Sequence, residues 1–196
     1  RPGAPGPSPI GPGPAPPAGP APAGVLGGLL LAMRLPVSMR ALGVPLLLPV
    51  LLWQAPRPPH GEFELLAADV GQGNAVLVRT AHRTLLYDAG PRYGTESDAG
   101  QRVLVPLLRA LGERVDTLLL SHRDSDHTGG AVPVLAAYPH AALAGSLEDG
   151  HPLRALRPFQ PCRAGDAWTW DGVQFTVLHP SPQEAATAGK PNAASC

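Results

Sequence analysis

The sequence predicts a mixed α/β domain of layered architecture over residues 62–196. Three observations support this fold class. Strand-like and helix-like segments follow one another in the order strands, helix, strand, helix, strands, which is typical of helices packed on a sheet. Residues 115–122 (VDTLLLSH) are a short apolar run of the kind found in buried strands. The residues before position 62 differ sharply in composition and are predicted to lie outside this domain.

The elements of the domain follow from turn signals and apolar patterning. In chain order they are strands over 62–70, 74–80 and 83–90, a helix over 98–112, a strand over 115–122, a helix over 129–139 and a hairpin over 166–180. Asp98 suits the N-cap of the first helix, Gly112 ends it, and Pro106 predicts a kink. The Asp171-Gly172 pair predicts a two-residue hairpin turn.

Three segments of other composition precede the domain. Residues 1–24 contain 10 Pro, 6 Gly and 5 Ala. Such a segment has almost nothing to bury and cannot offset the entropy of ordering, so a low-complexity, disordered tail is expected. Residues 25–53 are apolar, and residues 54–61 form a Pro-rich linker.

The apolar zone at residues 25–53 has two interpretations. Its runs at 25–33 and 41–53 are both shorter than the ~18–20 residues of a spanning helix. We expect the end of a membrane region, with Arg34 and Arg40 on the cytoplasmic side and the following domain on the opposite side. The alternative is an apolar, low-complexity segment without a membrane role.

The charge of the domain limits how it could contact nucleic acid. Residues 61–196 carry 11 basic and 15 acidic side chains, a net charge of −4. Bulk electrostatics therefore does not attract this domain to phosphates, and any such contact has to be local. Five arginines could line a phosphate path or be ordinary surface charges: Arg79, Arg83, Arg92, Arg102 and Arg123.

The two cysteines give no functional signal. Cys162 and Cys196 form neither a disulfide framework nor a metal-binding CxxC pair. They do not fix the redox compartment. Both are expected to be small apolar residues.

The strongest functional signal is SHRDSDHTGG at residues 121–130. An apolar strand leads directly into a loop that carries His122, Asp124, Asp126 and His127. Sites of α/β proteins form at such carboxyl-terminal strand ends. A divalent metal stabilises carboxylates and imidazoles at this spacing, because the cation supplies the opposite charge. The sequence predicts a metal site here; the alternative is a hydrogen-bonded turn with Asp caps.

Two weaker features precede this cluster. LLYDAG (85–90) ends a strand at Asp88, whose carboxylate could orient a metal ligand or begin a turn. ADVGQGNA (68–75) places Asp69 at a strand end, followed by a Gly-x-Gly turn. Phosphate binding at such a turn needs a helix after it. A strand follows instead, so a nucleotide site is not expected.

Together, DVGQG, LLYDAGPRYG, a Gln-Arg-Val helix and LLLSHRDSDHTGG resemble the C-terminal, metallo-β-lactamase-type domain of the ComEC/Rec2 family. That family forms the membrane channel for DNA uptake in bacterial competence. The resemblance covers residues 62–196, and the apolar zone before them resembles the end of the membrane region. It implies a four-layer αββα sandwich, truncated at its C-terminus, with a metal site at the sheet edge.

The resemblance also implies a ligand set. His122, Asp126 and His127 match the superfamily's metal-binding loop, and Asp124 stands where that loop has a second His. This Asp makes the site harder and shifts its preference from Zn²⁺ towards Mn²⁺ or Mg²⁺, with two ions expected. By the same resemblance, Asp88 is the orienting carboxylate and Asp126 manages the attacking water.

Later positions match the family less completely. His179, at a strand end, could supply a further ligand, and Asn192 and Ser195 resemble a polar Asn-x-x-Ser element of such domains. Asn74 stands where the family's DVGQGD motif usually has Asp. The downstream Asp and His that would complete a two-metal site are expected to lie beyond this chain.

The resemblance implies metal-assisted hydrolysis of phosphodiester bonds. The expected substrate is the single DNA strand that is degraded while its complement crosses the membrane. The membrane and other competence-machinery proteins are the expected partners. The expected location is the bacterial cytoplasmic membrane, with this domain on the extracytoplasmic side.

Two alternatives remain open. One is a soluble metallo-hydrolase of the same fold that acts on a small ester or thioester. The other is a non-catalytic domain that guides single-stranded DNA, which would need stacking aromatics and a basic groove. The chain has only three each of Trp, Tyr and Phe, and Trp168 and Trp170 lie in one hairpin, where packing is the expected role.

Overall fold

The computed structural model describes residues 19, 21–52, 56–187 and 191–196. Most of the expected disordered tail, residues 1–18 and 20, lies outside the described residues, as do positions 53–55 around the start of the linker. The chain divides into two compact units, one ending at Gln54 and the other beginning at Ala55. Each unit is described by itself.

The first unit is a helical hairpin. It consists of α1 (Ala21–Ala32), α2 (Val37–Ala41) and α3 (Gly43–Leu51). A Cβ atom on Gly27 would lie 2.7 Å from the Gly43 carbonyl oxygen, so only glycine permits α1 and α3 to approach this closely. The start of α1 corrects the predicted boundary, because the last residues of the tail, 21–24, are helical. Among the described residues, none of the helices has both the length and the apolar character needed to cross a membrane.

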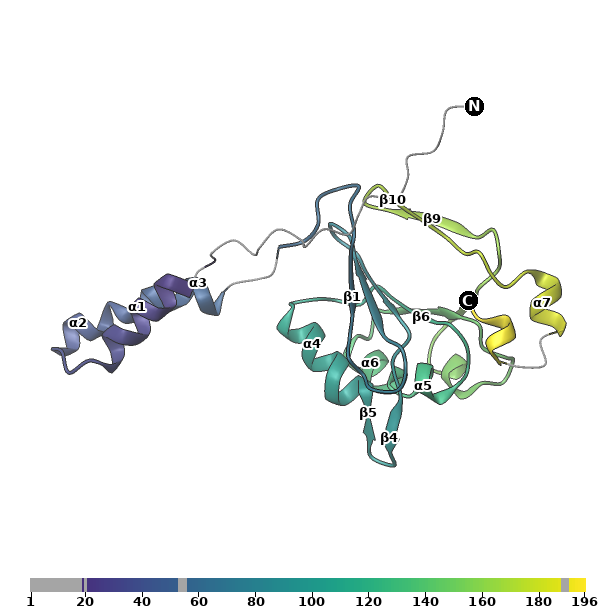
Figure 1. Cartoon of the computed structure of the whole chain (residues 1–196), viewed down its shortest axis with the longest axis horizontal. Helices are drawn as coiled ribbons and strands as arrows, with labels where there is room; N and C mark the ends of the chain where they lie inside the picture. Colours follow the sequence, from purple (N-terminus) through teal and green to yellow (C-terminus); the bar gives the residue numbers. More distant parts are fainter. Residues whose placement is uncertain (1–18, 20, 53–55, 188–190) are drawn as a thin grey trace. The chain divides into compact units, whose positions relative to one another are not determined.

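The second unit is built on a six-stranded sheet with the order β1-β2-β3-β6-β7-β8 (Figure 1). Its strands are β1 (Glu64–Ala67), β2 (Val76–Arg79), β3 (Thr84–Tyr87), β6 (Thr117–Leu120), β7 (Ala142–Gly145) and β8 (Phe159–Pro161). The first three strands pair antiparallel, and β3, β6, β7 and β8 pair parallel. The carboxyl ends of β3 and β6 therefore meet at one edge.

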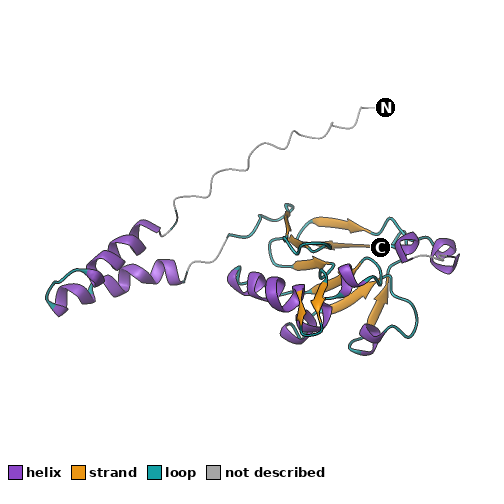
Figure 2. Cartoon of the chain, turned by 60° about the horizontal axis from the view of Figure 1, so that its bottom comes forward, coloured by secondary structure: helices purple, strands orange, loops and turns teal. Residues whose placement is uncertain are grey.

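Layers cover both faces of this sheet (Figure 2). Leu86, Leu118 and Leu120 point into the main core, which includes residues of α4 (Val105–Ala110) and α6 (Ala131–Ala137). Leu85 and Leu119 alternate with them and point to the opposite face. There they pack near Trp168 and Trp170 of the ribbon formed by β9 (Ala167–Trp170) and β10 (Val173–Thr176).

The expected strands and helices are present with shorter bounds. Asp98 accepts a hydrogen bond from the Gln101 N–H at 2.8 Å, as its predicted capping role requires. The first predicted helix begins as a π-helical segment, Gly100–Leu104, and becomes α-helical at α4, which carries Pro106 in its first turn. The change of helix type thus occurs where the proline was expected to cause a kink.

Several short elements escaped prediction. Besides β7 and β8, they include the ribbon of β4 (Arg92–Gly94) and β5 (Ser97–Asp98) and the 3-10 turn η2 (Pro152–Ala155). Strand β7 reads Ala-Leu-Ala-Gly and contains no β-branched or aromatic residue. Only its pairing between β6 and β8 makes it a strand, because its own residues have low strand propensity.

The hairpin turn forms at the predicted residues. Trp170 pairs with Val173, which leaves Asp171 and Gly172 as the turn, with φ values of 49° and 83°. The Asp171 carboxylate accepts hydrogen bonds from the Thr80 hydroxyl at 2.6 Å and from the His82 N–H at 2.7 Å. These bonds fix the hairpin tip on the turn between β2 and β3, and they hold the pKa of Asp171 well below its usual range.

Arg79 neither lines a phosphate path nor lies on the surface. Its side chain is buried and pairs with Glu113 at 2.7 Å and with Glu64 at 2.5 Å. Glu113 also accepts hydrogen bonds from Arg57 of the linker at 2.7 Å and from the Thr84 hydroxyl at 2.6 Å. A buried carboxylate of this kind needs such partners, and they attach the linker to the domain.

The expectation for the cysteines was wrong. Cys162, which follows β8, and Cys196 form a disulfide across 34 positions of sequence. The sequence offered no sign of this pairing, because two cysteines so far apart are brought together only by the order of the strands.

Candidate functional site

The polar residues of the loop 121–130 lie at the edge where β3 and β6 end. The parallel pairing of Leu86 with Leu118 and of Tyr87 with Leu119 sets the next residues of both strands side by side. The loop contains the one-turn helix α5 (Ser125–Thr128). A Cβ on Gly130 would lie 2.3 Å from the Ala89 carbonyl oxygen, so this glycine lets the loop pack directly on the chain after β3.

Asp88 is the centre of the hydrogen-bond network. It is fully buried and has a φ of 61°, which is unusual for a residue with a side chain. One carboxylate oxygen accepts from the Ser121 N–H at 2.7 Å. The other accepts from the Ser121 hydroxyl at 2.9 Å and from the Asn74 side-chain amide at 3.1 Å. This set of donors compensates the buried carboxylate for the hydrogen bonds to water that it loses on burial.

Asp88 also sets the tautomer of His127. Its second oxygen lies 2.7 Å from His127 Nδ1. A carboxylate only accepts, so Nδ1 carries a proton, and in the neutral ring Nε2 carries the lone pair. His127 Nε2 lies 3.4 Å from a carboxylate oxygen of Asp126. The ring is thus held by Asp88 through Nδ1. Its other nitrogen, Nε2, is the atom that could bind a metal, and it lies beside the Asp126 carboxylate.

His122 is held in the same manner by a different group. Its buried ring places Nδ1 2.9 Å from the Ser121 hydroxyl. That hydroxyl gives its only hydrogen to Asp88, so it accepts from His122 Nδ1, and Nε2 again carries the lone pair. His122 Nε2 lies 3.4 Å from a carboxylate oxygen of Asp124.

Asp124 occupies the N-cap position of α5 but does not cap it with its side chain. Its backbone carbonyl accepts from the N–H groups of His127 and Thr128, both at 3.0 Å. The carboxylate is therefore not used by the helix and remains beside His122. A simple capped turn does not account for this arrangement.

The two imidazole–carboxylate pairs are neighbours. The ring centroids of His122 and His127 lie 4.1 Å apart, with the ring planes at 48°. A lone pair that faces a carboxylate oxygen is repelled unless a proton or a cation lies between them. Imidazole and carboxylate together suit a divalent metal such as Zn²⁺ or Mn²⁺. Each histidine with its neighbouring aspartate offers two ligands of the kind such an ion binds. In the described ranges, no three His, Cys, Asp or Glu side chains converge closely enough to hold an ion.

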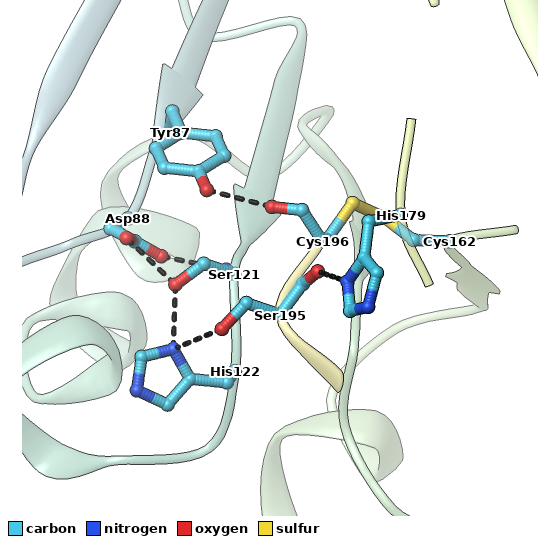
Figure 3. The surroundings of a disulfide bond; sticks show 8 residues. All are labelled: Tyr87, Asp88, Ser121, His122, Cys162, His179, Ser195 and Cys196. Atoms are coloured by element: carbon cyan, nitrogen blue, oxygen red, sulfur yellow. Dashed lines mark hydrogen bonds between the residues drawn. A yellow bond between two sulfur atoms is a disulfide. The ribbon is translucent and has the colours of Figure 1, made fainter. Parts of the chain in front are cut away.

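Two of the remaining predicted site residues, Ser195 and His179, lie beside this cluster (Figure 3). The Ser195 hydroxyl lies 3.3 Å from His122 Nδ1, and the Ser195 carbonyl oxygen lies 2.6 Å from His179 Nδ1. The other ring nitrogen of His179 lies 3.5 Å from Glu184 in α7 (Pro182–Thr187). Ser195 thus links His179 to the cluster.

Asn192 and Asp69 lie outside the network. Asn192 is exposed in the short turn η3 (Pro191–Ala194), and its backbone oxygen accepts from the Ser195 N–H at 3.4 Å. The exposed Asp69 accepts from the Gly71 N–H at 3.1 Å, so its carboxylate forms the turn before β2.

A family model described as the metallo-beta-lactamase superfamily matches residues 68–192, which include the whole cluster. The chain belongs to the metallo-beta-lactamase superfamily. The mixed sheet with helices on one face and a β-ribbon on the other confirms the predicted fold class, with β9 and β10 representing the second sheet.

Similar proteins place the chain more closely within the superfamily. It is 37% identical over 161 residues to Competence protein ComA of Neisseria gonorrhoeae, which covers 82% of this chain and 22% of ComA. It is 36% identical over 131 residues to Recombination protein 2 of Haemophilus influenzae, which covers 67% of this chain and 16% of that protein. These relatives confirm the resemblance to the ComEC/Rec2 family. The chain spans only about a fifth of the length of these relatives.

Solved structures of the superfamily are more distant. A metallo-beta-lactamase of Cronobacter sakazakii with a HARLDQ motif is 22% identical and aligns with a TM-score of 0.46, over 72% of this chain and 56% of its own. The family model and the relatives, rather than these structures, identify the chain as a metallo-β-lactamase domain similar to part of the competence proteins.

Sequence reasoning missed the residue that links the two histidines of this metallo-β-lactamase domain. The buried Ser121 hydroxyl contacts Asp88, His122 and, at 3.2 Å, His127 Nδ1. The sequence feature that could have identified Ser121 is its position directly before His122, at the end of an apolar strand. Asn74 departs from the family's DVGQGD motif, and in the structure its side-chain amide donates to Asp88.

Tyr87 is a further neighbour without a sequence signal. Its hydroxyl donates to the Cys196 carbonyl oxygen at 2.7 Å. Burial first, and the negative charge of Asp88 second, raise the pKa of the Tyr87 phenol above its usual range. The phenol therefore keeps the proton that this hydrogen bond needs.

Proposed function

We propose that this metallo-β-lactamase domain is a metal-dependent hydrolase that cleaves phosphodiester bonds of single-stranded DNA during DNA uptake. The observation that carries the proposal is the pair of histidines whose Nδ1 atoms are held and whose Nε2 atoms each lie 3.4 Å from a carboxylate oxygen. Enzymes that use metal ions orient their ligands in this way. The substrate is suggested by the similarity to ComA and Recombination protein 2.

In this proposal, His122 and Asp124 hold one divalent ion and His127 and Asp126 hold a second, with Mn²⁺, Zn²⁺ and Mg²⁺ as the candidate ions. A bound divalent ion lowers the pKa of water and neutralises charge on phosphoryl oxygens. Asp88 keeps the proton on His127 Nδ1 through the 2.7 Å contact, and Asp126 accepts the proton of the attacking water.

His179 has a less direct part in this proposal. Its contact with the Ser195 carbonyl oxygen, rather than with His122, supports a role in placing Ser195. Because Nδ1 lies against that carbonyl, metal binding by His179 would use Nε2, the ring nitrogen that lies 3.5 Å from Glu184.

We further propose that the domain acts at the bacterial cytoplasmic membrane, on its extracytoplasmic side, together with other competence-machinery proteins. The names of the similar proteins support the role in competence. The disulfide between Cys162 and Cys196 supports the compartment, because disulfides persist where the environment is oxidising.

The test is cleavage of a labelled single-stranded DNA oligonucleotide by the chain, with and without Mn²⁺. We expect Asp126→Asn to lower the metal-dependent rate by about 10²-fold or more, because it removes the proposed proton acceptor and ligand. The matched control is Asp149→Asn, which removes a carboxylate that is 99% exposed. Equal rates for the wild type and Asp126→Asn would remove the cluster from the chemistry.

The same purified chain also distinguishes the two alternative functions, a small-molecule hydrolase and a non-catalytic DNA-guiding domain. Metal-dependent hydrolysis of a small ester or thioester, without cleavage of DNA, would favour a small-molecule hydrolase. Affinity for DNA that survives removal of metal, without cleavage, would favour a guiding role. Trp168 is unsuited to stacking on bases, since its ring already stacks on Phe175 with the centroids 5.1 Å apart.

A further inference from the structure

The last residues of the chain are joined to the candidate site by several independent contacts. Cys196 forms the disulfide with Cys162. Its N–H donates to the Ser121 carbonyl oxygen at 2.7 Å, and its own carbonyl accepts from the Tyr87 hydroxyl at 2.7 Å. Ser121 and Tyr87 both flank Asp88, so the disulfide-bonded end lies against the network that orients the two histidines (Figure 3).

Ser195 connects this end to a candidate metal ligand. Its hydroxyl lies 3.3 Å from His122 Nδ1, the nitrogen that also contacts Ser121 at 2.9 Å. Its carbonyl oxygen lies 2.6 Å from His179 Nδ1. The position of one residue thus affects the rings of two histidines, and that residue is covalently followed by a disulfide-bonded cysteine.

We propose that the Cys162–Cys196 disulfide is a redox-controlled clamp that holds Ser195 against His122, so that its reduction releases Ser195 and frees the His122 ring. This inference shares one assumption with the proposed function, namely that His122 is a metal ligand. Ser195 is a positioning residue in this proposal.

The reductant of this clamp is a dithiol. One thiolate of the dithiol attacks a sulfur of the Cys162–Cys196 bond and forms a mixed disulfide, while the other cysteine leaves as a thiolate and takes up a proton. The second thiol of the reductant then displaces the remaining cysteine. The dithiol becomes a disulfide, and two electrons and two protons end on Cys162 and Cys196.

The surroundings of the disulfide permit this exchange. Cys162 is 9% exposed, and Cys196 is exposed to an intermediate degree. Cys162 borders two surface hollows, and Cys196 borders a third of about 460 Å³ between the sheet and the ribbon. A disulfide with such access is more easily reduced than one enclosed in a core.

Reduction removes the covalent bond that joins Cys196 to Cys162. The hydrogen bonds of Cys196 to Ser121 and Tyr87 then have to hold Ser195 by themselves. A segment held by hydrogen bonds alone opens locally at lower cost than one that is also held by a disulfide. Release of Ser195 leaves His122 Nδ1 with the Ser121 hydroxyl alone and leaves His179 without its carbonyl partner.

The test compares the oxidised and reduced forms of the full chain, without metal and without DNA. Thiol counting establishes each state, amide hydrogen exchange follows the Cys196 N–H, and nitrogen NMR of ¹⁵N-histidine follows the His122 ring. We expect dithiol to raise the exchange rate of the Cys196 N–H by about tenfold or more and to shift the His122 Nδ1 resonance.

Two variants separate the clamp from its target. Cys162→Ser is expected to show the released state with and without dithiol. Ser195→Ala keeps the disulfide, so dithiol should still accelerate exchange of the Cys196 N–H but should leave the His122 resonance unchanged.

The proposal of a clamp would be overturned if thiol counting found two free thiols in the chain purified without reductant. It would equally be overturned if a fully reduced wild type kept the exchange rate and the His122 resonance of the oxidised form, a result that does not depend on whether a variant folds. Neither readout involves hydrolysis, so a failure of DNA cleavage leaves the clamp standing, and a failure of the clamp leaves the proposed nuclease standing.

Discussion

At the scale of single residues, proton positions explain why the cluster suits a cation. Ser121 has one hydroxyl hydrogen and gives it to Asp88, which forces His122 to donate from Nδ1. Asp88 forces the same tautomer on His127. In the neutral rings, both Nε2 lone pairs then lie 3.4 Å from carboxylate oxygens. Repulsion within these pairs is relieved by positive charge, which is the physical basis of the proposed metal site.

Asn74 offers a direct test of this charge balance. Its side-chain amide donates to Asp88 at 3.1 Å, so Asn74→Asp would replace a donor by a second carboxylate. We expect this change to lower the free energy of unfolding at about pH 7 by about 1–3 kcal/mol in the absence of metal. One of the two carboxyl groups then has a raised pKa, so the loss should shrink as the pH falls through that raised value.

The measurement is urea unfolding of the wild type and Asn74→Asp at about pH 7 and about pH 5, with Asn74→Ala as the control. The alanine variant loses the hydrogen bond without gaining charge, so its loss of stability should be the same at both pH values. A pH-independent loss in Asn74→Asp would show that charge repulsion is not its cause.

At the scale of elements, the β9–β10 hairpin depends on one carboxylate at its tip. Hydrogen bonds from Thr80 and His82 lower the pKa of Asp171 in the folded protein. A group with a lowered pKa stabilises the fold above its ordinary pKa, near 4, and this contribution is lost as the pH falls. Acid should therefore loosen the hairpin before it affects the main core.

Asp171→Asn is expected to abolish this acid sensitivity, because asparagine tolerates the same positive φ but does not titrate. The measurement is fluorescence of the hairpin tryptophans, Trp168 and Trp170, from about pH 7 to about pH 3. Asp149→Asn, at a carboxylate far more exposed to water, is the control and should follow the wild type. An unchanged acid transition in Asp171→Asn would assign the transition to another group.

At the scale of the whole molecule, the disulfide closes a large part of the second unit. It joins two cysteines that lie 34 positions apart, and the chain between them contains β9 and β10. In the chain-entropy description, a loop of this length stabilises the native state by about 4 kcal/mol. Reduction should therefore lower the free energy of unfolding by about this amount.

Denaturant unfolding of the chain with and without a dithiol measures this loss. Cys162→Ser is the control, since dithiol should not change its unfolding midpoint. Equal midpoints for oxidised and reduced wild type would show that the disulfide does not restrain the unfolded chain.

The sequence by itself determined the layered α/β class, the turn at Asp171-Gly172 and the loop that carries the candidate ligands. These features are local: apolar runs, turn residues and closely spaced polar residues all act within a few positions of the chain. Strand β7 was not predictable in this way, because its Ala-Leu-Ala-Gly sequence becomes a strand only through its neighbours.

Tertiary structure alone decided which distant residues meet. Arg79 reads as a surface charge in the sequence, but the fold buries it against Glu113. Cys162 and Cys196 carry no pairing signal, but the fold brings the chain after β8 and the last residue to the same sheet edge. The physical reason is that pairings across many positions depend on strand order, and strand order follows from burying all apolar faces at once rather than from any short stretch of sequence.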